Sequence, residues 1–402
     1  MRVALIDPSL FTLPYDRRLA QGLEQEGHQV TLYSRRPGAD DNESGDVTLV
    51  SAFYRVAGHP AVSRLPGPVR LGLKGLDHWV SMVRLRRILV REAPDVIHFQ
   101  WLPLPVLDLR FLAGLHAIAP LVLTLHDTQP FNGNPSARLQ RIGVEDAIER
   151  FDRVIVHTEQ GRERMVSLGL AADTVACLPH GLLEDVVPAP ADPMDSPVTF
   201  LLIGKIKPYK GLDVLLEAFA RLPAAQRTQA RLRVVGKPYM DMAPLLTRAE
   251  ALGISDRLEF DGRFVADAAF AELMAVPGTV AVFPYREIEA SGVLGLAVGS
   301  GRPILASALG SFSETLVDGL HGRLLPPGDV DALAAGMREM IEDRGFASRC
   351  AAAVQALAGR VAGWNEIARS TVQVYEAAAQ HAAKTGSHPP AGRNRAVPRR
   401  VA

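Results

Sequence analysis

The sequence predicts an α/β protein made of two Rossmann-like domains in series. Short apolar runs bounded by turn residues alternate with amphipathic stretches of helix length, as in parallel sheets whose strands are joined by helices. The alternation stops at a stretch rich in Pro and Asp, Val187–Pro193, which we interpret as a linker, and then starts again. A chain of 402 residues is long enough for two domains that each bury a core.

The expected strands form two groups, one on each side of the linker. In the first half they are Val3–Ile6, Gln29–Tyr33, Val96–Phe99, Leu121–Leu125, Val154–Val156 and Val175–Leu178. In the second half they are Thr199–Ile203, Arg231–Val235, Leu258–Phe260, Val280–Phe283 and Pro303–Leu305. Helices are expected between them, and a last helix around Trp364–Ala379. The predicted divisions are 1–187 and 188–361 for the domains, 362–382 for the C-terminal helix and 383–402 for a disordered tail.

Composition excludes several classes of protein. Lys and Arg number 44 and so do Asp and Glu, which argues against a nucleic-acid-binding protein because phosphate binding needs a basic excess. Only two cysteines occur, Cys177 and Cys350, which suits a reducing compartment. The sequence has no signal segment and no spanning apolar run. We therefore expect a cytoplasmic protein, soluble or peripheral at the inner face of a membrane.

Several common active-site motifs are missing from the sequence. The first strand is followed by Asp7-Pro8-Ser9-Leu10 instead of Gly-x-Gly-x-x-Gly, so a dinucleotide cofactor has no support. There is no Walker loop, serine nucleophile elbow, His-Glu-x-x-His or paired Cys-x-x-Cys. The common hydrolase and zinc-enzyme classes are therefore not indicated, and neither is a dinucleotide cofactor.

A loop with two cations follows the first strand of the second domain. The strand ends at Gly204, Lys205 and Lys210 stand on the loop, and a helix begins after Gly211. Loops at the carboxyl ends of strands are where open α/β sheets bind ligands. The two lysines are placed to meet a diphosphate, although most lysines on loops are simply solvated.

A second candidate anion site lies at Ser291-Gly292, where a helix is expected to begin. Free N–H groups and the positive end of the helix dipole favour a phosphate there, and Gly292 lets the backbone approach it closely. A plain N-cap would explain Ser291 but not the acidic pair before it, Glu287 and Glu289.

These motifs resemble those of the family 4 glycosyltransferases, which are retaining enzymes with the GT-B fold. Leu202–Phe219 resembles the family's Gly-Arg-Leu-x-x-x-Lys-Gly motif, with Lys205 in place of Arg. The lysine keeps the positive charge but lacks the planar guanidinium that can donate two parallel hydrogen bonds. The second run resembles a branch reading Tyr-Arg-x-Ile-x-x-Ser-Gly-Val-Leu in place of the full Glu-x7-Glu motif, because Ile288 and Leu296 occupy the two Glu positions. The resemblance covers nearly the whole chain, except Arg36–Gly75 and the tail.

The resemblance implies two domains that face each other across a cleft, with the helix at Trp364 returning to the first domain. Leu123–Asp127 resembles the family's Thr-x-His-Asp segment, whose His contacts the donor sugar. The implied catalytic residues are His126, Lys205, Lys210 and one of Glu287 and Glu289. The implied donor-binding residues are Gly204, Lys205, Lys210, Arg263, Ser291, Gly292 and Val293, and those on the acceptor side are Asp127, Gln100 and Trp101.

The implied function is metal-independent, retaining transfer of a hexose from a UDP- or GDP-linked sugar. The acceptor would be a glycan or a lipid-linked molecule in polysaccharide or glycolipid biosynthesis. A nucleotide-sugar 2-epimerase and a non-catalytic nucleotide-sugar-binding protein remain alternatives, the second because of Leu296. The base, the sugar, the acceptor, the linkage and the oligomeric state stay open.

The segment Pro66–Glu92 interleaves basic and apolar residues. A basic amphipathic helix can lie on an anionic membrane, where lipid-linked acceptors are found. A surface helix whose apolar face packs on its own domain would show the same pattern. Peripheral membrane contact through this segment therefore remains one of two interpretations.

Overall fold

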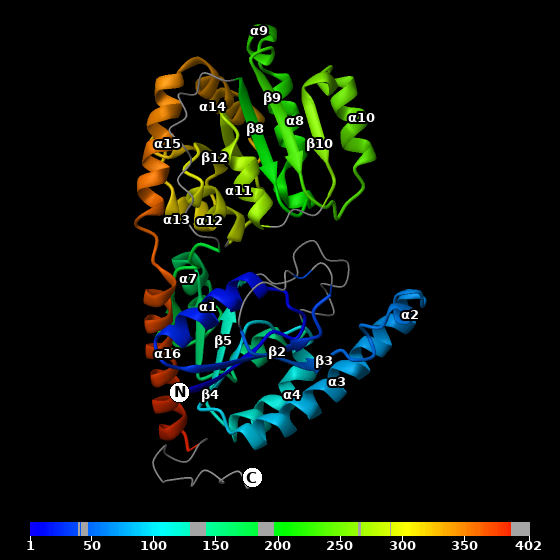
Figure 1. Ribbon diagram of the computed structural model, residues 1–402, viewed down its shortest axis with the longest axis vertical. Helices are drawn as coiled ribbons and strands as arrows, with labels where there is room; N and C mark the ends of the chain where they lie inside the picture. The colour runs from blue at the N-terminus through cyan, green and yellow to red at the C-terminus, as the bar shows by residue number, and fades with distance from the viewer. Residues whose placement is uncertain are drawn as a thin grey trace, which may run out of the picture.

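The computed structural model describes residues 1–38, 41, 47–128, 142–183, 197–263, 267–289 and 291–386. Two α/β domains lie one above the other, and the last helix runs beside the first domain (Figure 1). Each domain holds one parallel sheet with helices packed on it. The predicted fold class, two Rossmann-like domains in one chain, is confirmed.

The first domain contains a sheet of seven parallel strands in the order β3-β2-β1-β4-β5-β6-β7. The chain begins in the middle, at β1, runs to one edge and then returns to β4 beside β1. In open sheets of this kind, ligands bind where the order reverses, outside the carboxyl ends of the strands. The strands are β1 Arg2–Ile6, β2 Gln29–Arg35, β3 Leu49–Phe53, β4 Val96–Phe99, β5 Leu121–Leu125, β6 Arg153–Val156 and β7 Val175–Cys177.

The second sheet repeats this topology with six parallel strands in the order β10-β9-β8-β11-β12-β13. Here the order reverses between β8 and β11, so the loops that follow these two strands meet at one edge. Along β8 the side chains alternate between two apolar cores, with Phe200 and Leu202 on one face and Leu201 and Ile203 on the other. The strands are β8 Val198–Ile203, β9 Ala230–Val235, β10 Leu258–Asp261, β11 Thr279–Phe283, β12 Ile304–Ser307 and β13 Gly322–Leu325.

Helices connect the strands in both domains. Those of the first domain are α1 Leu13–Gln25, α2 Pro60–Ser63, α3 Gly67–Glu92, α4 Pro105–His116, α6 Val144–Ile148 and α7 Glu159–Ser167. Those that follow are α8 Leu212–Ala220, α9 Ala224–Arg227, α10 Ala243–Ala251, α11 Asp267–Ala275, α12 Gly292–Gly299, α13 Gly310–Thr315, α14 Val330–Glu342, α15 Arg344–Ala358 and α16 Trp364–Lys384. Short 3-10 turns, η1 Pro208–Lys210 and η2 Ser255–Arg257, precede α8 and β10.

The structure departs from the sequence prediction at three places. Strands β3 and β13 were not predicted. Helix α16 continues to Lys384, so the first residues of the segment expected as a tail are helical. The linker Val187–Pro193, the division between 187 and 188, and residues 387–402 of the tail lie outside the described residues.

Helix α16 packs against α1 and is part of the first domain's core. The indole N–H of Trp364 donates to the carbonyl of Leu182 at 2.6 Å, and the Tyr375 hydroxyl lies 2.8 Å from Nδ1 of His98. The two helices approach so closely that a Cβ at Gly22 would lie 2.6 Å from the Trp364 carbonyl oxygen. The chain thus crosses from the first domain to the second and back.

The loops after β8 and β11 touch through their backbones. Gly211 ends the turn η1 with a φ of 67°, and a Cβ there would lie 1.9 Å from the Pro284 carbonyl oxygen. Beside this contact, the N–H of Arg286 donates to the Tyr209 carbonyl at 2.7 Å, and its guanidinium makes two bonds to the carboxylate of Asp213. Glycine is therefore required at 211 both for its conformation and for the space it leaves.

We expect Gly211→Ala to lower the free energy of unfolding of the second domain by about 2–5 kcal/mol. A positive φ costs an alanine about 1–2 kcal/mol, and the overlap with Pro284 adds about 1–3 kcal/mol. The control is Gly253→Ala, at a φ of 64° with no atom within 4 Å of its Cβ, which should carry only the conformational cost. Urea unfolding of both variants measures the difference. Equal losses would show that the contact with Pro284 is not tight.

Candidate active site

Three residues from two separate sequence motifs meet at the carboxyl end of β8. Gly204 has a φ of 107°, and a Cβ there would lie 3.3 Å from both Nζ of Lys210 and Cγ2 of Val293. The Lys210 ammonium lies 5.0 Å from the centre of the Tyr285 ring, which is itself buried. The structure therefore brings the expected diphosphate loop and the start of α12 together around one amine.

The environment of Lys210 is unusual for a lysine. Its side chain is 5% exposed, and no carboxylate pairs with it in the part of the chain that the structure describes. Burial, with smaller contributions from Lys207 and Lys205, lowers the pKa of Lys210 to about 7. A buried cation without a counter-ion is stabilised by a bound anion, so this position favours a negatively charged ligand.

The N-terminus of α12 lies beside Lys210. Ser291 is the N-cap residue, and its side chain makes no capping hydrogen bond, so the alternative of a plain serine cap is not what the structure has. A Cβ at Gly292 would lie 3.0 Å from the side chain of Leu183 in the first domain. The helix start therefore faces the junction of the domains, where its backbone N–H groups can serve an anion.

Lys205 extends toward the first domain. Its ammonium lies 5.4 Å from the centre of the Phe11 ring, and Phe11 stacks on Trp101 with ring centres 4.9 Å apart. Phe11 follows β1 and Trp101 follows β4, so this aromatic pair stands where the strand order of the first sheet reverses. Phe11 was not predicted from the sequence as a site residue, and it is 51% exposed although its side chain is large and apolar.

His126 follows β5 and is held by buried polar groups. Its Nε2 lies 3.1 Å from Oε1 of Gln100, and its Nδ1 lies 3.3 Å from Nε2 of His157. The Tyr15 ring packs edge-on against it at 4.7 Å. Gln100 is wholly buried, so it positions His126 and does not open onto a ligand.

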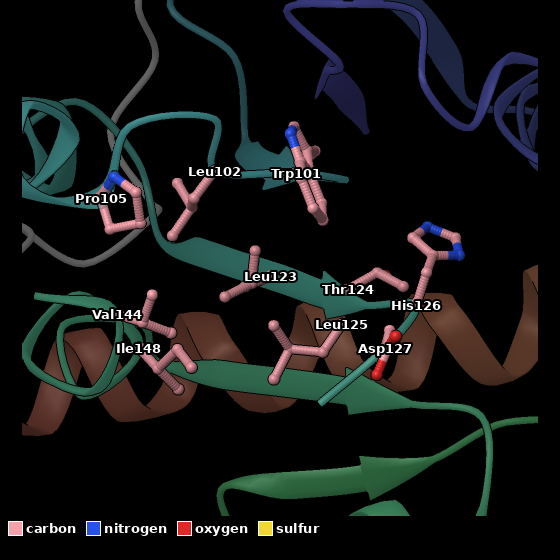
Figure 2. Close-up of a pocket in the computed structure, with 10 residues that line it drawn as sticks. All are labelled: Trp101, Leu102, Pro105, Leu123, Thr124, Leu125, His126, Asp127, Val144 and Ile148. Carbon is pink, nitrogen blue, oxygen red and sulfur yellow. The ribbon is translucent and has the colours of Figure 1, made fainter. Parts of the chain in front are cut away.

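A pocket opens beside His126 in the first domain (Figure 2). It is a shallow hollow that is open to solvent at its mouth. Thr124, His126 and Asp127 supply polar groups at one end. The rest of the lining is mostly apolar and comprises Trp101, Leu102, Pro105, Leu123, Leu125, Val144 and Ile148.

Acidic side chains of the second domain bind backbone groups of the first. The Glu289 carboxylate accepts hydrogen bonds from the N–H of Thr128, at 2.8 Å, and from its hydroxyl. Burial raises the pKa of Glu289, and the bonds to Thr128 oppose that rise. Glu314 accepts from the N–H groups of Glu159 and Gln160, at the start of α7. Glu289 is thus engaged between the domains.

Two other predicted site residues are exposed to solvent. Glu287 is exposed. Arg263 follows β10, two strands away from β8, and its guanidinium pairs with Asp261. Of the residues expected on the donor side, the structure therefore groups Gly204, Lys210, Ser291, Gly292 and Val293, while Lys205 spans the junction and Arg263 stands apart.

Comparison with known proteins gives consistent matches along the chain. The model of Glycosyltransferase Family 4 matches residues 16–183, and that of Glycosyl transferases group 1 matches residues 197–343. The chain is 28% identical over 400 residues to D-inositol 3-phosphate glycosyltransferase of Xylanimonas cellulosilytica, covering 90% of each protein. It is 30% identical over 332 residues to the protein of that name from Geodermatophilus obscurus, covering 76% of this chain and 69% of the relative. Relatives of the same name from Mycobacterium are matched over 62% of their length.

A solved structure shares the arrangement of both domains. The crystal structure of Anabaena HepE in complex with UDP and glucose superposes with a TM-score of 0.71 at 19% identity. The match covers 94% of this chain and 99% of HepE. At this level of identity the match establishes the common fold.

Proposed function

Since the chain belongs to glycosyltransferase family 4, we propose that it transfers a hexose from a UDP- or GDP-linked sugar with retention and without a metal. The observation that carries this proposal is Lys210, which is buried between Gly204 and the start of α12 and has no carboxylate partner among the described residues. HepE, which has the same fold, binds UDP and glucose, and this favours UDP as the nucleotide here. No other cofactor enters the reaction.

The diphosphate of the donor lies between Lys210, Lys205 and the first N–H groups of α12. Two cations and a helix dipole neutralise the leaving group, so the reaction needs no metal ion. His126 contacts the sugar from the opposite domain, and Glu287 is the acid still available to it, because Glu289 is bound to Thr128. Leu296 accepts no hydrogen bond, so the ribose is held by other groups.

Transfer passes through a transition state with oxocarbenium character at the anomeric carbon. The bond from this carbon to the diphosphate oxygen breaks as the acceptor oxygen bonds on the same face. The acceptor's proton moves to the departing phosphate oxygen, and the configuration is retained without a protein nucleophile. His126 and Asp127 line the pocket from which the acceptor hydroxyl approaches.

The acceptor is a glycan or a lipid-linked molecule, and apolar side chains of the first domain beside His126 are available to contact it. Five of the lining side chains are leucine, valine or isoleucine: Leu102, Leu123, Leu125, Val144 and Ile148. Such acceptors belong to polysaccharide or glycolipid assembly at the cytoplasmic face of a membrane. Among the described residues, no helix is long and apolar enough to cross a membrane.

Helix α3 supplies the peripheral membrane contact. Its C-terminal half packs into the domain through Met82, Leu85 and Leu89, whereas Leu71 and Leu76 in its N-terminal half are 50% and 63% exposed. From Arg55 to Arg91 the only acid is Asp77, which is buried beneath the N–H groups of Val56 and Ala57. The exposed half of α3 therefore presents apolar side chains together with basic ones and no exposed acid, as binding to anionic lipid requires.

We expect a matching nucleotide diphosphate sugar to raise the melting temperature of the protein in the presence of EDTA, because the ligand binds only the folded state. The panel consists of UDP, GDP, ADP and their common sugar conjugates. Lys210→Met should weaken binding by about 10- to 100-fold, since a charged hydrogen bond contributes roughly 1.5–3 kcal/mol. Lys384→Met, which removes an exposed lysine at the end of α16, is the control and should bind normally.

Turnover of the identified donor tests the reaction itself. NMR of the sugar first released to water should show the donor's own anomer. The opposite anomer would contradict retention, and a melting shift seen only with Mg²⁺ would contradict metal independence. An epimerised nucleotide sugar formed without acceptor would identify a 2-epimerase instead.

Donor binding should take up a proton at pH 8. The pKa of Lys210 is about 7 in the free protein, so most of the amine is neutral at pH 8, and the bound diphosphate raises that pKa and favours the ammonium. Affinity should be constant below pH 7 and fall above it. Calorimetry at pH 8 in two buffers of different ionisation enthalpy counts the proton. Undiminished uptake in Lys210→Met would assign it to another group.

We expect the protein to float with anionic vesicles and not with neutral ones. Leu71→Gln/Leu76→Gln should reduce the bound fraction by roughly tenfold or more, because two leucines no longer enter the bilayer. The control is Val166→Gln/Leu168→Gln, which changes two exposed apolar residues at the end of α7. Equal flotation of both double variants would remove α3 from the membrane contact.

A further inference from the structure

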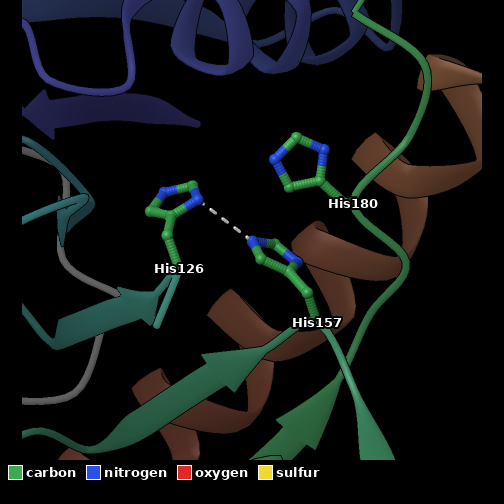
Figure 3. Close-up of side chains that lie close together, drawn as sticks. All are labelled: His126, His157 and His180. Atoms are coloured by element: carbon green, nitrogen blue, oxygen red, sulfur yellow. Dashed lines mark hydrogen bonds between the residues drawn. The ribbon is translucent and has the colours of Figure 1, made fainter. Parts of the chain in front are cut away.

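Three histidines from consecutive strands of the first sheet converge on one point (Figure 3). His126 follows β5, His157 follows β6 and His180 follows β7, and these strands are neighbours in the sheet. Each ring offers one nitrogen, and the three nitrogens lie within 4.8 Å of one another. Of these three histidines, only His126 was predicted from the sequence as a catalytic residue.

The outer hydrogen bonds of the first two rings decide where their lone pairs point. Nδ1 of His157 lies 3.0 Å from the carbonyl oxygen of Leu178, which only accepts, so this nitrogen carries the proton and Nε2 has the lone pair. Nε2 of His126 lies 3.1 Å from Oε1 of Gln100 and carries the proton for the same reason. Nδ1 of His126 and Nε2 of His157 therefore face each other at 3.3 Å with a lone pair each.

The third ring completes the arrangement. Nδ1 of His180 lies 3.3 Å from the Gly181 carbonyl, which leaves its Nε2 unprotonated as well. Tyr15 packs against all three rings, with ring centres 4.7 to 5.2 Å apart.

We propose that His126, His157 and His180 form a binding site for Zn²⁺. Neutral imidazole is a preferred zinc ligand, and zinc–nitrogen bonds are about 2.0–2.1 Å long, so two ligands of a tetrahedral ion lie about 3.3–3.4 Å apart. The pair His126–His157 already has this separation, and a small rotation brings His180 to the same ion. Leu178 and Gln100 fix the outer N–H groups, as outer partners of zinc-binding histidines do.

The site has a functional consequence that rests on the proposed function. Zinc occupies the Nδ1 atom of His126 and fixes that ring beside the pocket, so it competes with the sugar for the same side chain. Zn²⁺ is then a reversible inhibitor of transfer and takes no part in the chemistry.

Zinc binding is measured first on the full chain without any nucleotide. The protein is treated with EDTA, dialysed and titrated with Zn²⁺ against a chromophoric chelator. One equivalent should bind, and His157→Gln and His180→Gln should each weaken it by at least about 100-fold. His59→Gln, at an exposed histidine before α2, is the control and should bind zinc normally. No stoichiometric binding, or binding unchanged in both variants, would overturn the proposal.

Two further measurements distinguish failure of the zinc site from failure of the proposed function. Co²⁺ in the wild-type protein should give the intense visible absorption of a four-coordinate ion, which decides the matter if both substitutions unfold the chain. Donor binding is followed on the same preparation by the melting shift in EDTA. Zinc binding without a donor shift would remove the proposed function and leave the metal site, whereas a donor shift without zinc binding would do the reverse.

Discussion

The contact between Gly211 and the Pro284 carbonyl is the constraint on which the rest of the second domain's site depends. It holds the loops after β8 and β11 at a distance that no side chain at 211 permits. Lys210 precedes this glycine, so the same contact places its ammonium beneath Tyr285 and against Gly204. The burial that follows lowers the pKa of Lys210, which costs stability in the free protein and is recovered when an anion binds. The backbone contact of Gly211 with Pro284 thus keeps the Lys210 amine in a buried position that is unfavourable for its charged form.

Contacts between the domains extend this arrangement to the first domain. Glu289, seven residues before Leu296 in the chain, binds Thr128, and Thr128 follows the segment that carries His126 and Asp127. Gly310 approaches the backbone of Glu289 so closely that a Cβ would lie 2.5 Å from its carbonyl oxygen, which fixes this acid against α13. The second acid, Glu314, lies on α13 itself and binds the start of α7. Two carboxylates at one corner of the junction therefore contribute to the position of the histidines relative to Lys210.

Elements of the fold and site that depend on a local sequence pattern could be predicted from the sequence, whereas those that depend on long-range packing could not. The apolar runs of β1 and β8 are buried on both faces, and such runs identify strands from sequence alone. By contrast, β3 lies at a sheet edge with three half-buried residues, and β13 begins with Gly322-Arg323, so neither shows a strong pattern. Lys210 and Gly204 were found because they share one loop. Phe11, His157 and His180 were missed because only the strand order brings them to the site.

The two sides of the junction differ in charge in a way that suits the proposed chemistry. The second domain presents cations where the diphosphate departs with negative charge. The first domain presents His126, whose pKa is held well below its usual range by burial and by the neighbouring histidines, so the ring beside the sugar stays neutral. A charged imidazolium about 4 Å from an oxocarbenium centre would raise the barrier by about 4 kcal/mol at an effective dielectric constant near 20. The neutrality that avoids this repulsion also leaves lone pairs on the three rings. A metal ion bound there would restore the repulsion, which is why the same cluster can serve transfer when empty and suppress it when occupied.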